Sequence, residues 1–491
     1  MCFSLFFPIL LLLTTMQIGC SALKKRDDVP VISSEANISE SVRQALSTDA
    51  FRKGGWPSDR WWERFRDEAL NRLIERALVG NPGLKEALAR VRASEEEART
   101  VSSALFPQCG VSLTDRYQHL SKEDLDRFPP SRVPAVINQA RLLLDVGYEL
   151  DLFGRNKKRF RAAVHEAKRE KAAMEQARLT VTTHLAQSYF SYRALRHRIE
   201  EQKELIRLQN RLLLLSDIRK RNALDDTRKR EIVQATFHEM EEELIRAERD
   251  LSVCVSQINI LTGASPDAPL PADCGGRTAG LQGGGRAPFP LPENLPVDLL
   301  SRRPDLMMHI ERVRAMAAMV GVARTAFFPN INLASFIGLE SLHPGRLFRV
   351  GSFAGGLAPA IHLPLFTGYR LRSGLRKACA DFDAAVFAYN EALLHASKEV
   401  SDGLVLLRTS YTMARLQGER VATLFRAVDL TDINVTNGVE SEVASIDGKI
   451  AAIRSIREET VAIYANRLAT CALIRALGGG YVHRQNEIVS L

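Results

Sequence analysis

The chain has 491 residues, of which 45% are hydrophobic and 25% are charged, and its formal net charge is +9. This ordinary hydrophobic fraction excludes disorder of the whole chain. A basic chain can bind nucleic acid or an anionic membrane. Here, however, Lys and Arg are interspersed with Glu and Asp, and no aromatic residues are interleaved to stack on bases. Seven widely separated cysteines without a Cys-x-x-Cys pair argue against a zinc site and a disulfide framework.

The N-terminus predicts export. An apolar run over residues 3–18 is long enough for the core of a signal peptide and short for a membrane-spanning helix. The glycine and Cys20 after this run resemble a bacterial lipoprotein cleavage site, which implies a signal peptide at 1–19 and a lipid on Cys20. Gln17 stands where leucine is usual and no basic residue precedes the run, so an ordinary signal peptide or an uncleaved anchor remains the alternative. Ser21 favours delivery to the outer membrane.

The following segments predict an arm and then helices joined to strands. Residues 20–53 are polar and lack periodicity, which predicts an extended N-terminal arm. A first structural repeat is predicted over 54–262, with two helices, strands at 108–117 and 141–150, and a long helical hairpin. Each strand has about ten residues of alternating character, the length of a tilted membrane-spanning strand. Soluble hairpins would show the same period, so the pattern favours a membrane strand only modestly.

The helical hairpin is long because no proline interrupts it. From Arg155 to a turn near Asp225, one helix would extend about 100 Å at about 1.5 Å per residue. The returning helix has apolar positions spaced alternately by three and four, which is the seam of a coiled coil: Leu244, Ala247, Leu251, Cys254, Ile258 and Leu261. Such a seam needs partner helices, so an assembly larger than one chain is predicted.

The second half of the chain repeats this layout. After a linker predicted at 263–300, rich in Gly and Pro, a second structural repeat is predicted over 301–480 and a C-terminal tail over 481–491. Its strands are predicted at 330–339 and 353–363.

Two spacings indicate an internal duplication. Phe106 and Phe328, each at or near a Phe-Pro pair that ends a helical stretch, lie 222 positions apart (328 − 106). Gly154 and Gly368, each before a long helix, lie 214 positions apart (368 − 154). Offsets this similar mean that one unit of helix, two strands and long helical hairpin occurs twice.

No residue cluster supports catalysis or metal binding. Ser301–Asp305 could bind phosphate, but helix capping by Ser301 or Asp305 and local pairing of the arginines is the favoured interpretation. Gly478–Gly480 lacks the preceding strand and the following Lys-Ser/Thr of a phosphate loop, so a turn that ends a helix is predicted. The histidines do not cluster, and no catalytic triad stands out. No enzyme, metal or cofactor is therefore predicted.

Several ordered stretches resemble the TolC-like outer-membrane efflux channels, in particular the lipoprotein subgroup associated with RND pumps. The strongest are Tyr148–Arg155, Leu299–Asp305, Ala326–Leu333 and Ala476–Tyr481. The resemblance implies a mixed α and β membrane protein that forms a homotrimer. Each protomer would give four strands to a 12-stranded β-barrel, and its long antiparallel helical hairpins to a periplasmic α-barrel.

The resemblance also implies function, partners and location. The chain would be the outer-membrane channel of a tripartite efflux system that conducts substrates passively from the periplasm to the exterior. Its partners would be a periplasmic adaptor protein and an inner-membrane RND-type pump, and the only attached group would be the lipid on Cys20. The alternative is a periplasmic coiled-coil scaffold without a pore, which would leave the paired strands unused.

In this family each hairpin turn carries an Arg-x-x-x-Gly type pattern, followed by acidic residues that narrow the pore. Arg221 matches in the first turn, where Asp225 replaces the glycine. Gly438 matches in the second turn, where Asn434 replaces the arginine. Adaptor docking is thereby implied at Arg221, Asp225 and Gly438. Carboxylates repeated by symmetry would form a ring that attracts cations, and the candidates are Asp225, Glu231, Glu440 and Glu442. Solvated charges at helix ends are an equally weighted alternative.

Overall fold

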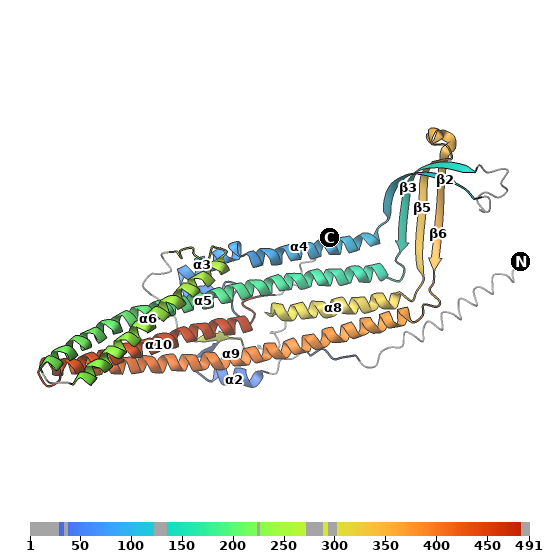
Figure 1. Cartoon of the computed structure of the whole chain (residues 1–491). Coiled ribbons are helices and arrows are strands. Elements are labelled where there is room, and N and C mark those ends of the chain that lie inside the picture. The colour runs from blue at the N-terminus through green and yellow to red at the C-terminus, as the bar shows by residue number, and fades with distance from the viewer. Residues whose placement is uncertain are drawn as a thin grey trace.

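The computed structural model describes residues 29–33, 38–121, 135–222, 226–271, 288–292 and 302–482. Its helices form an elongated body, and a four-stranded sheet stands at one end of it (Figure 1). Cys20 and Asp225 lie outside the described residues, as does the predicted signal peptide.

The first repeat contains helices on both sides of a strand pair. Asp67 begins the first helix, because its carboxylate accepts hydrogen bonds from the backbone of Ala69 and Leu70. Asn81 begins the next helix in the same way, with a proline in the first turn. In chain order the elements are α3 (Glu68–Gly80), α4 (Pro82–Ser102), η2 (Ser103–Leu105), β2 (Gln108–His119), β3 (Val136–Leu150), α5 (Arg155–Arg221) and α6 (Thr227–Thr262).

The second repeat has the same order of elements. They are α8 (Pro304–Thr325), β5 (Asn330–Ser341), β6 (Phe353–His362), α9 (Arg370–Thr436) and α10 (Glu442–Ala476). Helices α5 and α9 each have 67 residues, which corresponds to about 100 Å at about 1.5 Å per residue. Left-handed backbone turns the chain from strand into long helix in both repeats, at Gly154 (φ 71°) and at Gly368 (φ 53°). The predicted duplication and the long hairpins are confirmed.

Two parts differ from the sequence prediction. Strands β2 and β3 are longer than predicted because they pair without interruption from Gln108↔Gly147 to His119↔Val136. The arm was expected to be extended, but it contains helix α2 (Ser39–Leu46), with Val42 and Ala45 buried. Two buried positions are too few to show a helical period in the sequence.

The arm and the linker meet in a small sheet of their own. Strand β1 (Phe51–Lys53) pairs in parallel with β4 (Phe289–Leu291), which lies inside the predicted linker. The short helix η1 (Trp61–Phe65) follows, with both of its tryptophans buried. These pieces cover the middle of the helical body and complete its main hydrophobic core, in which α3, α5, α9 and α10 also take part.

The helices form a row that follows the order of the strands. The sheet order is β2-β3-β5-β6, and all its neighbours are antiparallel. Next to the sheet the packing order is α4-α5-α8-α9 (Figure 1). Toward the far end the contacts between helices follow the order α6-α5-α10-α9. In the described part of the chain, no helix combines the length and the apolar character needed to span a membrane.

Candidate functional site

The four-stranded sheet has one apolar and one polar face. The strand register aligns Leu113, Leu142, Leu339 and Phe353 in one row across the sheet, on the apolar face. The adjacent row contains Thr114, Arg141 and Glu340, whose side chains lie on the polar face. On the apolar face Val111, Leu113, Phe353, Leu357 and Ile361 are each 67–72% exposed. On the polar face Arg141 pairs with Glu340 at 3.0 Å. An exposed apolar face opposite a hydrated face is the arrangement of strands that separate lipid from water.

Adjacent positions on β6 test this assignment. Leu357→Arg is expected to cost about 2–4 kcal/mol of insertion free energy, because it places a charge against lipid. Ala358→Arg is the matched control, since residue 358 lies on the polar face and its arginine would remain in water. The measurement is the amount of each variant recovered folded in outer-membrane fractions. Equal recovery of both variants would show that the apolar face does not contact lipid.

The far ends of the two helical hairpins form the second part of the site. Helix α9 ends in a glycine turn, where Gly438 has φ 72° and the backbone N–H of Val439 donates to the Asn434 carbonyl. Ser441 then caps α10, and Asp226 caps α6 in the other hairpin. The turn in which the sequence predicts Gly438 is thereby confirmed as a tight helix-ending turn.

Of the predicted carboxylates, three lie in the part of the chain that the structure describes, and they differ in their partners. Glu442 is the first residue of α10; its carboxylate accepts a hydrogen bond from Nε of Arg211 of α5 at 3.0 Å and forms an ion pair with Nη2 of the same arginine at 2.8 Å. Glu231 lies at the start of α6 and pairs with Arg230. Glu440 is exposed in the turn and has no ion pair to any described residue. Arg221 is the last residue of α5, and it is exposed.

The sequence analysis missed one aspartate in each hairpin that links the two helices of that hairpin, a contact called a clasp below. In the first, Asp217 of α5 accepts a hydrogen bond from Arg230 of α6 at 2.9 Å. In the second, Asp432 of α9 accepts one from Ser445 and pairs with Lys449 of α10 at 3.0 Å. Asp217 and Asp432 lie 215 positions apart (432 − 217), close to the offset of the duplication. That offset is the signal by which the clasps could have been found.

Polar contacts also join the two hairpins to each other along the α5–α10 seam. Arg457 of α10 donates to Gln202 of α5 at 3.1 Å and to Glu243 of α6 at 3.0 Å. Next to it, Thr460 donates to Glu201 at 3.0 Å. Burial raises the pKa of the Glu201 carboxyl to about 7, because the charged form loses water that the seam does not replace. Together with Arg211–Glu442, these contacts hold the second hairpin against the first.

Two motifs singled out in the sequence meet in the middle of the body. Arg303 is 6% exposed; it pairs with Asp305 and Glu399 and donates to the carbonyl of Ala476 at 2.8 Å. The predicted local pairing is confirmed for Arg303. The predicted capping by Asp305 is wrong, because Asp305 lies inside the first turn of α8 and the cap position has no side-chain hydrogen bond. Ser301 lies outside the described residues. Because Arg303 precedes α8 and Ala476 ends α10, this side chain ties both ends of the second repeat together.

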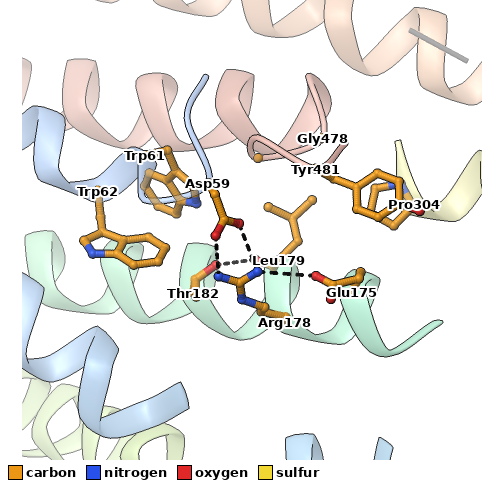
Figure 2. A pocket seen from close by; sticks show the side chains of 11 residues that line it. Asp59, Trp61, Trp62, Glu175, Arg178, Leu179, Thr182, Pro304, Gly478 and Tyr481 are labelled. Carbon is orange, nitrogen blue, oxygen red and sulfur yellow. Dashed lines mark hydrogen bonds and ion pairs between the residues drawn. The ribbon is translucent and has the colours of Figure 1, made fainter. Parts of the chain in front are cut away.

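The glycine turn after α10 fits into the same region. Gly478, Gly479 and Gly480 all have positive φ, and a Cβ on Gly478 would lie 1.9 Å from the carbonyl oxygen of Arg302. Figure 2 shows the pocket beside this turn, where Arg178 binds Asp59 through two hydrogen bonds of 2.9 and 3.0 Å. The turn ends the helix, as predicted, and the pocket's charges are paired with each other. This region has a structural role.

Each protomer has two open edges. One consists of β2, α4 and α6, and the other of β6 and α9; among the described residues, neither α4 nor α6 packs along α9. Both edges carry large exposed apolar side chains: Ile232, Ile245, Val253 and Ile260 on α6, and Phe387, Leu394, Val405, Leu406, Met413 and Leu416 on α9. Unpaired strand edges and apolar helix faces need partners.

No group of three or more His, Cys, Asp or Glu side chains suited to a metal ion occurs within the described ranges.

Comparison with known proteins identifies the architecture. The family model described as "Outer membrane efflux protein" matches residues 73–264 and 295–479. Multidrug resistance outer membrane protein MdtQ of Escherichia coli O6:H1 is 24% identical, over 97% of each chain. Outer membrane protein OprJ of Pseudomonas aeruginosa is 27% identical, over 87% of this chain and 88% of its own length.

A solved structure gives the same result. The outer membrane protein VceC of Vibrio cholerae superposes with a TM-score of 0.75 at 26% identity, over 87% of this chain and all of its own. The two-faced sheet, the paired long hairpins and the duplicated layout agree with these matches. Both the family and the fold are those of channels rather than enzymes. The chain belongs to the outer membrane efflux protein family and is an outer-membrane efflux channel protein with a helical periplasmic extension.

Proposed function

We propose that three copies of this chain close into one channel that conducts substrates from the periplasm to the exterior. The observation that carries the proposal is the alignment of the open edges. The edge strand β2 lies on the same side of the protomer as the edge helices α4 and α6, and the edge strand β6 lies on the same side as α9. Both sides are therefore unpaired along the whole length, from the sheet to the hairpin ends. A neighbouring copy would pair β6 with β2 and cover α9 with α4 and α6. Closure by further copies satisfies the edge hydrogen bonds that lipid cannot supply.

The charges of the hairpin ends fit such a closed ring. Over residues 217–231 the first hairpin end has six Lys and Arg against four Asp and Glu, and over residues 426–449 the second has two Lys and Arg against five Asp and Glu, so the first end is net basic and the second net acidic. In a ring the two kinds of end would alternate, so each open edge would meet charge of the opposite sign. We propose that these ends narrow the channel and that Arg221, Asp225 and Gly438 lie where a periplasmic adaptor docks.

Among the predicted gate carboxylates, Glu440 is the best candidate for the pore. Glu442 binds Arg211 and Glu231 binds Arg230, whereas Glu440 is exposed and unpaired among the described residues. Glu440→Gln is expected to lower the permeability ratio of K⁺ to Cl⁻ in planar bilayers, since one carboxylate per protomer is lost. Glu68→Gln, at an 88% exposed side chain of α3, is the control. An unchanged ratio would remove Glu440 from the gate.

The N-terminal arm supports a lipid anchor on Cys20. Asn390 of α9 donates to the carbonyl of Val31 and accepts from the N–H of Ser33, both at 3.0 Å. Asn390 lies 20 residues (390 − 370) below the sheet end of α9, which is about 30 Å along a helix. The 11 residues from Cys20 to Val31 can span about 36 Å. A lipidated Cys20 could therefore reach the membrane that holds the sheet.

The partners follow from the relatives. The toluene efflux pump outer membrane protein TtgF of Pseudomonas putida is 28% identical, and by its name it serves a pump. We propose that this chain likewise serves an inner-membrane pump of the RND type through an adaptor. A pore-free coiled-coil scaffold is not favoured, because it gives the exposed apolar face of the sheet no role.

Native mass spectrometry of the detergent-purified mature protein tests trimer and lipid together. The expected mass is that of three chains, each beginning at Cys20 and carrying acyl groups. Cys20→Ala is expected to give a trimer without the lipid mass, because closure depends on the edges and not on the anchor. A wild-type protein that remains monomeric would contradict the trimer. A trimer of unmodified chains would contradict the lipid alone.

A further inference from the structure

The connection between β5 and β6 forms a folded loop at the end of the sheet remote from the helices (Figure 1). It contains two short helical turns, η5 (Pro344–Arg346) and η6 (Val350–Ser352). The hydroxyl of Ser352 donates to the carbonyl of Arg346 at 2.8 Å, and this bond closes the loop across both turns. Leu347 is 5% exposed and anchors the loop. The loop therefore presents its other side chains in fixed positions.

Two of these side chains are large, apolar and almost fully exposed. Phe348 is 82% exposed and Val350 is 96% exposed. Two arginines, Arg346 and Arg349, are also exposed and have no carboxylate partner among the described residues. A folded loop that holds apolar groups in water forgoes the free energy of burying them, so such groups mark a contact surface. Adjacent unpaired guanidinium groups suit phosphate oxygens.

The loop continues the apolar face of the sheet. Phe353, the first residue of β6, lies on the same face as Leu357 and Ile361, and it is paired with Leu339 of β5. The loop residues precede Phe353 directly, at the point where the apolar face ends. In a membrane this is the level at which hydrocarbon gives way to headgroups, where aromatic and basic side chains concentrate.

We propose that this loop binds the outer surface of the membrane, with Phe348 and Val350 inserted among the acyl chains and Arg346 and Arg349 on the phosphates of anionic lipid headgroups. The proposal rests on the proposed function for its orientation, because helices on the periplasmic side place the loop on the outer side. It adds an anchoring contact beyond the strands. This contact would fix the height of the sheet in the membrane.

A tryptophan at the loop apex provides the test. F348W trimers would be reconstituted in phosphatidylglycerol vesicles with and without brominated acyl chains, which quench only indoles that enter the bilayer. Of the three native tryptophans, Trp61 and Trp62 are buried and Trp56 is half-buried against the main core of the helical body. The emission of the wild-type protein under each quencher is subtracted to isolate that of the added indole. Loss of most of the added emission is expected. V439W, at a 75% exposed position of the hairpin turn, is the control and is expected to be quenched by aqueous iodide instead.

The arginines are tested in the same variant. R346Q and R349Q added to F348W are expected to reduce quenching by brominated lipid in phosphatidylglycerol vesicles, and to have little effect in phosphatidylcholine vesicles. Inorganic phosphate added to the buffer separates the two phosphate sources. If it abolishes the difference between the vesicles, the arginines bind free phosphate and the lipid assignment is overturned.

Two further results would overturn the proposal. If the added indole of F348W is quenched by iodide as strongly as that of V439W, the loop stays in water. If it is shielded from both quenchers, the loop packs on protein, over the pore or against a neighbour. In both cases the protein still floats with the vesicles, and the channel assignment stands. Protein that does not float would contradict the membrane assignment itself.

Discussion

Arg211→Gln combined with Arg457→Gln is expected to raise the ratio of open to closed channels by at least about tenfold, because the contacts that hold the two hairpins together are lost and each loss of about 1.4 kcal/mol changes a two-state ratio by this factor. Arg457 is only 24% exposed and joins the α5–α6 hairpin to α10. A partly buried, charge-assisted hydrogen bond contributes about 1.5–3 kcal/mol. Arg211 and Glu442 are about half exposed, so that pair adds at most about 1 kcal/mol.

The measurement is single-channel recording in planar bilayers. Arg415→Gln is the matched control, because Arg415 pairs with Glu419 within α9 and its loss leaves the seam intact. An open probability that is the same in the double variant and the control would show that these contacts do not hold the hairpins together. Restoring Arg457 alone is expected to recover most of the closed state, since it is the more buried of the two arginines.

Gly478→Ala is expected to destabilise the folded chain by at least about 3 kcal/mol, since backbone overlap adds to the strain of a left-handed residue. Gly478 has φ 87°, and its Cβ would lie 1.9 Å from the Arg302 carbonyl oxygen, a backbone atom that cannot move alone. To relieve the overlap, the start of α8 would have to move away from α10. The contact between Arg303 and the Ala476 carbonyl would be lost with it.

Gly374→Ala is the control for this variant. Gly374 lies in helix α9 and a Cβ there would contact nothing within 4 Å, so alanine is expected to stabilise by about 0.4–1 kcal/mol. The measurements are the thermal unfolding midpoint in detergent and the yield from outer membranes. A midpoint for Gly478→Ala equal to that of the wild type would show that the glycine turn is not tightly held.

The sequence was sufficient to predict the architecture because its strongest signals are periodic and repeated. The similar offsets of the Phe106/Phe328 and Gly154/Gly368 pairs required two equivalent units. The long proline-free stretches required long helices. Neither the duplication nor the long helices had to be inferred from specific residue contacts. Both predictions therefore hold even where a predicted helix or strand end is wrong by a few residues.

Contacts between hairpins could not be predicted in this way. A straight helix drifts by about 20° per heptad from a strict seven-residue repeat, so over 67 residues the face of α5 that meets α10 is set by accumulated twist. The pairing of Arg211 with Glu442, 231 positions apart, depends on that twist. Glu442 was therefore predicted at the tip but not on the seam. The clasps at Asp217 and Asp432 were accessible in principle, because they follow the duplication.

Electron microscopy of the detergent-purified mature protein tests the central claim most directly, that open-edged protomers close into a channel. The expected image is a hollow cylinder with threefold symmetry, a short wide end formed by the strands, and a long section of about 100 Å formed by α5 and α9. A single rod without a lumen, or an open arc of protomers, would contradict closure along the α9 edge and with it the channel built from these copies.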